Sequence, residues 1–265
     1  MQGINLMQGD CLERIKEIKD GSVDMVLTSP PYNIGKAYET VVPLREYVDW
    51  QSRIIRAVSS KLKNGGSICW QIGNAVIDGA VYPIDCLLFS AFIDAGLTPR
   101  NRIVWTFGHG LHCKRRFSGR HETILWFTKG NDYTFNLDAV RVPSKYPQKK
   151  YYKGPKKGMV SSNPLGKNPE DVWAISNVKH NHPEKTEHPC QYPEHLCDRL
   201  VLALTNKNDT VLDPFMGSGT TGVSSKNLSR SFIGIELDER YLRIAQDRIM
   251  RSDTAKSAIA GLTGK

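Results

Sequence analysis

The stretch VLDPFMGSGTTG, near the C-terminal end, constrains the fold more than any other feature of the sequence. Gly217, Gly219 and Gly222 fit the pattern G-x-G-x-x-G between a predicted strand and a predicted helix. Glycines at these positions allow a tight turn and close approach of a ligand, and the helix N-terminus offers free N–H groups. Glu236 ends the next predicted strand, where a carboxylate can bind the ribose of a nucleoside cofactor. The sequence therefore predicts an α/β fold with a nucleoside-cofactor site.

This glycine motif stands in an unusual place, because only about 45 residues follow it. A dinucleotide-binding unit normally opens its domain, and the dehydrogenase pattern does not require the Asp-Pro-Phe that precedes these glycines. A circularly permuted chain explains the position, since the termini of compact domains lie close together and tolerate relocation. An NAD-dependent oxidoreductase is the competing interpretation of the glycines alone.

Short apolar runs alternate with amphipathic stretches on both sides of a less regular middle region. The alternation occupies residues 1–105 and resumes after residue 187. Residues 101–107 and 122–129 predict two strands joined by a basic loop, which form an antiparallel hairpin. This order predicts a Rossmann-like, doubly wound α/β fold with a mostly parallel sheet.

A second motif, VLTSPPYNIG, follows a predicted buried strand near the N-terminus. Pro30 and Pro31 cannot continue a sheet ladder, because neither has an N–H to donate. Ser29 Oγ and the Pro30 carbonyl are hydrogen-bond acceptors whose directions the rigid prolines fix, and Tyr32 offers a flat aromatic face. The strand therefore ends in a rigid turn that can receive N–H donors.

Together the two motifs resemble those of the amino-group DNA methyltransferases, which modify cytosine N4 or adenine N6 with S-adenosylmethionine. Ser29-Pro30-Pro31-Tyr32 matches the catalytic motif of that family, and FMGSG matches its cofactor motif F-x-G-x-G. The order, with the catalytic motif first and the cofactor motif last, is similar to the beta group of the family. The resemblance covers about residues 5–250.

The resemblance implies S-adenosylmethionine as the cofactor and double-stranded DNA as the substrate. It implies that Ser29, Pro30, Pro31 and Tyr32 are catalytic: the acceptors orient the amino group of a flipped base, and the tyrosine stacks on that base. The implied cofactor contacts are Asp10, His188, Pro189, Asp213, Pro214, Phe215, Gly217, Gly219, Thr220, Thr221 and Glu236.

The resemblance also divides the chain into four parts. Residues 1–130 correspond to the catalytic half of the α/β domain, and residues 188–250 to its cofactor-binding half. Residues 131–187 fall where the family has an inserted target recognition region. Residues 251–265 are expected to form a flexible tail.

The charge of the chain favours a polyanionic partner. The net charge is +9, and the segment from Arg141 to Lys157 is rich in lysine, has no acidic residue and contains three tyrosines. Such segments neutralise phosphates and release counterions, although a solvated surface is the alternative. The expected DNA contacts are Arg115, Arg116, Arg120, Lys149, Lys150, Lys156 and Lys157.

Two other chemistries are disfavoured. Cys190 follows a proline, as the nucleophile of cytosine-C5 methyltransferases does, but the other residues of that chemistry are not evident. His109, His112, Cys113 and His121 have no standard zinc spacing, so no metal site is expected. The six cysteines show no disulfide pattern, which indicates reduced thiols and a cytoplasmic protein.

Several questions stay open at the level of sequence. Thr-Ser-Pro-Pro-Tyr favours cytosine N4 slightly, and the following NIG resembles adenine N6 enzymes. A non-catalytic DNA-binding protein is a further alternative. The protein is expected to be bacterial, archaeal or phage-encoded in a prokaryotic host, where a companion restriction endonuclease and a second copy of the chain are possible partners. No membrane span is expected.

Overall fold

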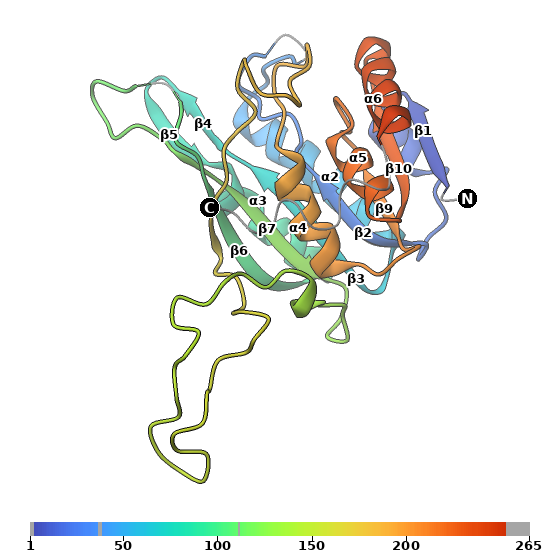
Figure 1. Ribbon diagram of the computed structural model, residues 1–265. Coiled ribbons are helices and arrows are strands. Elements are labelled where there is room, and N and C mark those ends of the chain that lie inside the picture. The colour runs from blue at the N-terminus through green and yellow to red at the C-terminus, as the bar shows by residue number, and fades with distance from the viewer. Residues whose placement is uncertain (1–2, 37–38, 111, 253–265) are drawn as a thin grey trace.

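The structure, a computed structural model, describes residues 3–36, 39–110 and 112–252. The strands are β1 (Ile4–Gln8), β2 (Val23–Thr28), β3 (Leu62–Ile72), β4 (Asn74–Ile77), β5 (Ala80–Pro83), β6 (Thr98–Thr106), β7 (His121–Thr128), β8 (Val172–Ala174), β9 (Thr210–Asp213) and β10 (Ser231–Glu236). Eight of them form one sheet in the order β1-β10-β9-β2-β3-β7-β6-β8, and β4 pairs with β5 in a separate ribbon (Figure 1).

The sheet is mostly parallel, as the sequence predicts. Five neighbouring strands, β1, β10, β9, β2 and β3, run in one direction, and β7 lies antiparallel to both β3 and β6. The carboxyl ends of the five parallel strands therefore meet at one edge of the sheet, together with the β6–β7 loop. The edge strand β8 was not predicted, because a three-residue strand is too short to show a periodic pattern.

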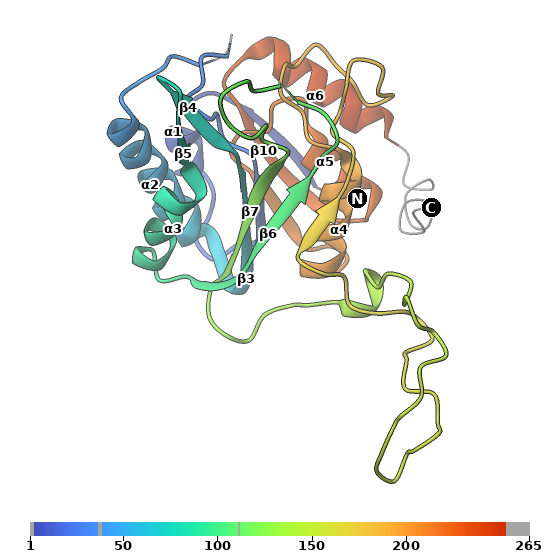
Figure 2. The same cartoon turned by 90° about the vertical axis from the view of Figure 1, so that its left-hand side faces the viewer.

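Helices cover both faces of the sheet. Figure 2 shows the helices of the N-terminal half of the chain on one side of the sheet and those of the C-terminal half on the other. Apolar residues of the first three pack into one core, and those of the last three pack into a second core. In the last helix Tyr241, Ala245 and Ile249 recur every four residues and are buried, as one face of an amphipathic helix requires. The helices are α1 (Cys11–Ile15), α2 (Leu44–Lys61), α3 (Ile84–Asp94), α4 (Glu194–Leu204), α5 (Thr220–Asn227) and α6 (Glu239–Arg251), with a 3-10 turn η1 (Leu137–Ala139).

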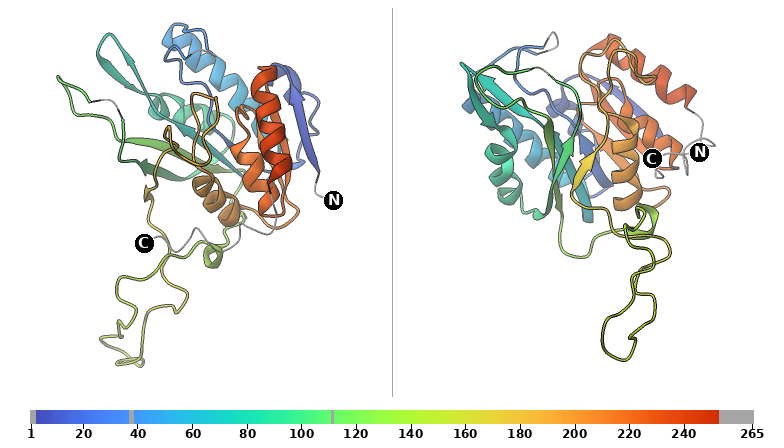
Figure 3. Two further views of the ribbon diagram at one scale, coloured as in Figure 1. Left: turned by 45° about the horizontal axis from the view of Figure 1, so that its top comes forward. Right: turned by 60° about the vertical axis from the view of Figure 1, so that its left-hand side comes forward.

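Residues 141–167 form a long excursion, here called the basic arm, which projects away from the body of the protein (Figures 1 and 3). Its sides are joined by isolated bridges between Val142 and Lys167 and between Lys150 and Val160. The arm follows β7, whose last residue Thr128 pairs with Ser67 near the start of β3. It therefore leaves the sheet at the edge opposite the carboxyl ends of the parallel strands.

Some expectations are not tested by this architecture. The four-part division of the chain, its circular permutation and the inserted recognition region stay predictions. Residues 253–265 of the expected tail lie outside the described residues. Within the described ranges, no helix is both long and apolar enough to cross a membrane.

Candidate active site

A cleft of about 1240 Å³ opens at the carboxyl ends of the parallel strands. It brings both sequence motifs together, because β2 and β9 are neighbours in the sheet although they are far apart in the chain. Of the predicted catalytic and cofactor residues, Asp213, Gly219 and Thr221 do not line it. The predicted residues that do are Asp10, Ser29, Pro30, Pro31, Tyr32, His188, Pro189, Pro214, Phe215, Gly217, Thr220 and Glu236.

The turn after β2 is fixed by contacts from outside the motif. Tyr47 Oη of α2 donates to the Pro31 carbonyl at 2.7 Å. Asn33 has a φ of +60° and exchanges two hydrogen bonds, each 2.8 Å long, with the backbone of Val42. These contacts hold the two prolines, and therefore Ser29 and Tyr32, at the wall of the cleft.

A carboxyl group from β7 faces this turn; it lies outside both motifs and was not predicted from the sequence. Tyr32 Oη donates to Glu122 Oε2 at 3.1 Å, and the Gln71 amide of β3 donates to the same oxygen. Ser29 Oγ donates to Tyr32 Oη at 3.3 Å. Burial raises the pKa of Glu122 above its usual value, and the bonds from Tyr32 and Gln71 act in the opposite direction. A polar chain therefore connects Ser29 with a carboxyl group of a distant strand.

Asp213 lies beneath the cleft and connects four parts of the fold. Its carboxylate accepts hydrogen bonds from Thr28 at 2.6 Å, from Thr221 at 2.7 Å and from Tyr192 at 3.2 Å. It also accepts the backbone N–H of Phe215. Burial raises the pKa of this fully buried carboxyl. Asp213 and Thr221 therefore tie the two motifs to each other from below.

The glycines of the cofactor motif are required by packing. A Cβ on Gly219 would lie 2.8 Å from Ala245 Cβ and 3.0 Å from its Cα, and the φ of +80° is unfavourable for other residues. Gly217 has a φ of +53°, and its Cβ would meet the ring of His188 at 3.1 Å. Gly219 thus permits the approach of α6 to the loop, and Gly217 permits the approach of His188.

Three further predicted residues, Glu236, His188 and Asp10, line the cleft wall. Glu236 accepts the Gly217 N–H at 2.8 Å, and burial raises its pKa. His188 packs against Tyr241 with ring centroids 4.4 Å apart, and burial lowers its pKa to about 4, so the ring is neutral near pH 7. Asp10 caps α1 by accepting the Leu12 N–H at 2.9 Å. Each residue thus has a structural partner and also faces the cleft.

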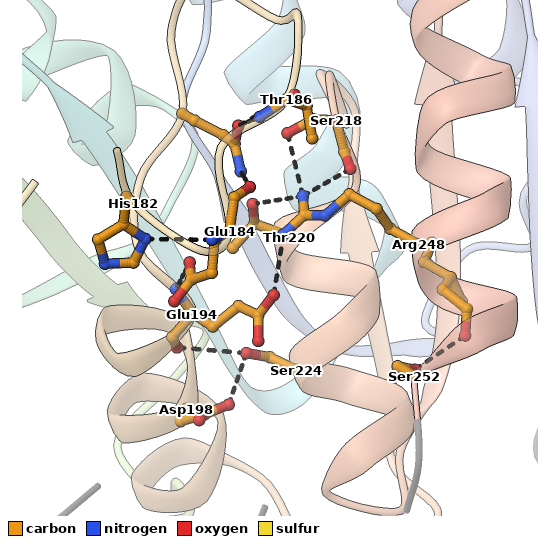
Figure 4. Close-up of polar contacts among 12 residues, drawn as sticks. His182, Glu184, Thr186, Glu194, Asp198, Ser218, Thr220, Ser224, Arg248 and Ser252 are labelled. Atoms are coloured by element: carbon orange, nitrogen blue, oxygen red, sulfur yellow. Dashed lines mark hydrogen bonds and ion pairs between the residues drawn. The ribbon is translucent and has the colours of Figure 1, made fainter. Parts of the chain in front are cut away.

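Arg248 of α6 holds the glycine loop in place, although it belongs to neither sequence motif and was not predicted (Figure 4). Its Nη1 donates to the Ser218 carbonyl at 2.7 Å, and to Ser218 Oγ and Thr220 Oγ1 at 3.1 Å each. Its Nη2 pairs with Glu194 Oε1 of α4 at 2.8 Å. Burial is the largest influence on the carboxyl of Glu194 and raises its pKa to about 7.

The predicted DNA contacts fall into two separate groups. Arg115, Arg116 and Arg120 lie in the β6–β7 loop, which contributes His109 and Gly110 to the cleft. The predicted lysines, Lys149, Lys150, Lys156 and Lys157, lie exposed on the basic arm at the opposite edge of the sheet. The structure therefore does not bring the two groups together.

The residues weighed for other chemistries have ordinary surroundings. Cys190 is exposed at the cleft wall, and its carbonyl contacts His188 Nδ1. Within the part of the chain that the structure describes, no three histidine, cysteine or acidic side chains are grouped so that they could hold a metal ion.

The fold and the cleft define a class of protein. A glycine loop and a Ser-Pro-Pro-Tyr turn that share one cleft of a mostly parallel sheet are the arrangement of an amino-group methyltransferase. Residues 23–247 match the family model described as DNA methylase, so the chain belongs to this family. The prediction of an amino-group DNA methyltransferase is thereby confirmed, and the oxidoreductase alternative is not supported.

Individual relatives agree with this assignment. The Type II methyltransferase M.BglII of Bacillus subtilis is 54% identical over 91% of this chain and 67% of the relative. The DNA adenine methyltransferase YhdJ of Escherichia coli (strain K12) is 32% identical over 92% of this chain and 82% of the relative. The solved PvuII DNA methyltransferase (cytosine-N4-specific) matches the fold with a TM-score of 0.76 and 24% identity, over 97% of this chain and 89% of that chain.

Proposed function

We propose that the protein transfers a methyl group from S-adenosylmethionine to the exocyclic amino group of a base in double-stranded DNA. The observation that carries the proposal is the single cleft that joins the Ser29–Tyr32 turn to the glycine loop. Cytosine N4 is slightly preferred from the sequence, and adenine N6 is the alternative. The relatives include proteins named for each base, so their names favour neither.

The cleft suits S-adenosylmethionine. A solved M1.HpyAVI-SAM complex matches this chain with a TM-score of 0.64 and 25% identity, over 93% of this chain and 98% of that chain. Here Glu236 would accept hydrogen bonds from the ribose, and Phe215 and Trp50, with ring centroids 5.6 Å apart, form an aromatic wall for the adenine. The cofactor supplies a methyl group on a positively charged sulfur, so the residues of this chain have mainly to position the reactants.

The Ser29–Tyr32 turn would receive the target base after it leaves the duplex stack. The amino nitrogen is a poor nucleophile, because its lone pair is conjugated into the ring. Ser29 Oγ and the Pro30 carbonyl would accept its two hydrogens and turn the lone pair toward the methyl group, while the Tyr32 ring stacks on the base.

We propose that Arg115 and Arg116, which lie in the same β6–β7 loop as the cleft residues His109 and Gly110, contact the DNA backbone beside the target base. The lysines of the basic arm form a second and separate phosphate contact. Neutralising each group in its own variant tests this division, because each lost phosphate contact should weaken binding to all sequences and flatten the salt dependence. An unchanged salt slope in the arm variant would assign its lysines to a solvated surface.

The wider setting is also proposed from the resemblance. Relatives named Type II methyltransferases favour a companion restriction endonuclease in a prokaryotic cytoplasm. A homodimer is a further proposal. The oligomeric state measured by light scattering, with and without DNA, tests it.

Mass analysis of bases in DNA from cells that express the protein tests the function and identifies the base. Ser29→Ala should slow single-turnover methylation without weakening the binding of cofactor or DNA, because an interaction felt in the transition state lowers turnover alone. Ser22→Ala, whose hydroxyl donates to the Lys19 carbonyl, is the matched control. A wild-type rate in Ser29→Ala would contradict the acceptor role.

A further inference from the structure

Two hydroxyl groups and a carboxyl group form a directed chain of hydrogen bonds along the wall of the cleft. Ser29 Oγ donates to Tyr32 Oη at 3.3 Å, and Tyr32 Oη donates to Glu122 Oε2 at 3.1 Å. Because each hydroxyl donates toward Glu122, the lone pairs of Ser29 Oγ stay available on the side of the cleft. These three hydrogen-bonded groups can therefore accept a proton at Ser29 and deliver one to Glu122.

The surroundings of Tyr32 fix the geometry of these hydrogen bonds. A Cβ on Gly73 would lie 2.9 Å from Tyr32 Cε2, so the glycine leaves the space that the ring occupies. The Gln71 amide donates to the same Glu122 oxygen that accepts from Tyr32. A carboxylate oxygen that accepts two hydrogen bonds is held in one orientation. The three groups are thus positioned by β3 and β7 rather than by the motif alone.

We propose that Glu122 receives the proton that the amino group loses during methyl transfer, through the hydroxyls of Tyr32 and Ser29. This inference rests on the function proposed above and extends it to a residue outside both motifs. In this scheme the Tyr32 ring supports the base, and its hydroxyl passes the proton.

The atoms and electrons of the step balance. The bond between the amino nitrogen and the methyl carbon forms while the carbon–sulfur bond breaks, and the electron pair of the broken bond stays on sulfur. The nitrogen then loses a proton to Ser29 Oγ and keeps the electron pair of that N–H bond. Ser29 passes its own proton to Tyr32, and Tyr32 passes its proton to Glu122. Both hydroxyls end unchanged, and the carboxylate becomes a neutral acid.

The electrostatics of Glu122 suit a proton acceptor. Burial raises the pKa of its carboxyl, which makes it more basic than an exposed glutamate. The groups that face it are Tyr32 from the loop after β2, Gln71 from β3 and Trp105, its register partner on β6. Of these only Tyr32 titrates, and its pKa lies well above 10. Glu122 is partly exposed and lines the cleft, so it can return the proton to water after the product leaves.

Glu122→Gln and Tyr32→Phe test the relay, because each breaks it with little change in volume. We expect each to lower the single-turnover rate by about 100-fold, a typical share for general acid–base catalysis, with unchanged binding of cofactor and DNA. The double variant should lose no more than either single variant, since both act in one chain. Glu17→Gln, at an exposed carboxyl paired with Arg14, is the matched control.

Two pH measurements separate a relay from a structural role. The wild-type single-turnover rate should fall as the pH drops through the pKa of Glu122. The pH–rate profile of Glu122→Gln should lack this fall at low pH. Without cofactor, NMR of labelled glutamate carboxyls should show a higher pKa for Glu122 in Tyr32→Phe, because the lost hydrogen bond favoured the charged form. The signal missing in Glu122→Gln assigns the resonance.

The outcomes distinguish this inference from the proposed function. Absence of methyl transfer by the wild-type protein would overturn the function, and the relay with it. An active wild-type protein whose Glu122→Gln variant keeps its rate and pH profile would overturn the relay alone. Losses that multiply in the double variant would also overturn it, since they would show that Tyr32 and Glu122 act independently.

Discussion

Replacement of Arg248 by methionine should loosen the glycine loop. Methionine keeps the apolar stem of the side chain and removes four hydrogen bonds, three to the loop and one to Glu194. The pair is largely buried, with side-chain exposures of 15% for Arg248 and 28% for Glu194. Breaking a buried pair typically costs about 3–5 kcal/mol. The pKa of Glu194 is already about 7, so in the variant this carboxyl can take up a proton instead of remaining an unpaired charge. We therefore expect Arg248→Met to lower the free energy of unfolding by about 2–3 kcal/mol.

Thermal unfolding and titration calorimetry measure the two consequences. For a chain of this size the loss corresponds to roughly 4–10 °C in Tm. A loosened loop should also weaken S-adenosylmethionine binding by about tenfold, which equals about 1.4 kcal/mol. Arg251→Met on the same helix is the control, because Arg251 is 82% exposed and pairs at 3.4 Å with Asp247, which is itself exposed. If Arg248→Met has the same Tm as Arg251→Met and binds the cofactor as tightly as the wild-type protein does, Arg248 does not hold the glycine loop in place.

Two further predictions concern the same half of the protein. Gly219→Ala should lower the free energy of unfolding by about 2 kcal/mol or more, because its Cβ would meet the Ala245 backbone at 3.0 Å. Gly3→Ala is the control, because a Cβ on Gly3 would enter open space. Equal denaturant midpoints for the two variants would contradict the packing argument. Because the folded pKa of Glu194, about 7, lies above its ordinary 4.5, this carboxyl stabilises the fold below about pH 4.5 and loses that contribution as the pH rises through about 7. Between about pH 4.5 and pH 7, the free energy of unfolding should fall less in Glu194→Gln than in the wild-type protein. Parallel pH dependences in the two proteins would refute the raised pKa of Glu194.

Much of the fold could be predicted because its signals are local. The glycine loop between a strand and a helix, and the Pro-Pro turn after a buried strand, each carry their meaning within about ten residues. The alternation of strands and helices indicated the mostly parallel sheet. The edge strand β8 escaped prediction, because three residues show no period and only pairing with β6 defines them.

The sequence by itself determined the family, through two motifs whose residue types are dictated by local backbone geometry and by hydrogen-bonding chemistry. Only the tertiary structure decided which distant side chains meet those motifs. Glu122 reaches Tyr32 across 90 positions, and Arg248 reaches Ser218 across 30. It also decided that the basic arm leaves the sheet at the edge opposite the cleft. A charge or a carboxyl has no periodic pattern of its own, so its partners are fixed only when strand order and helix packing place it in space.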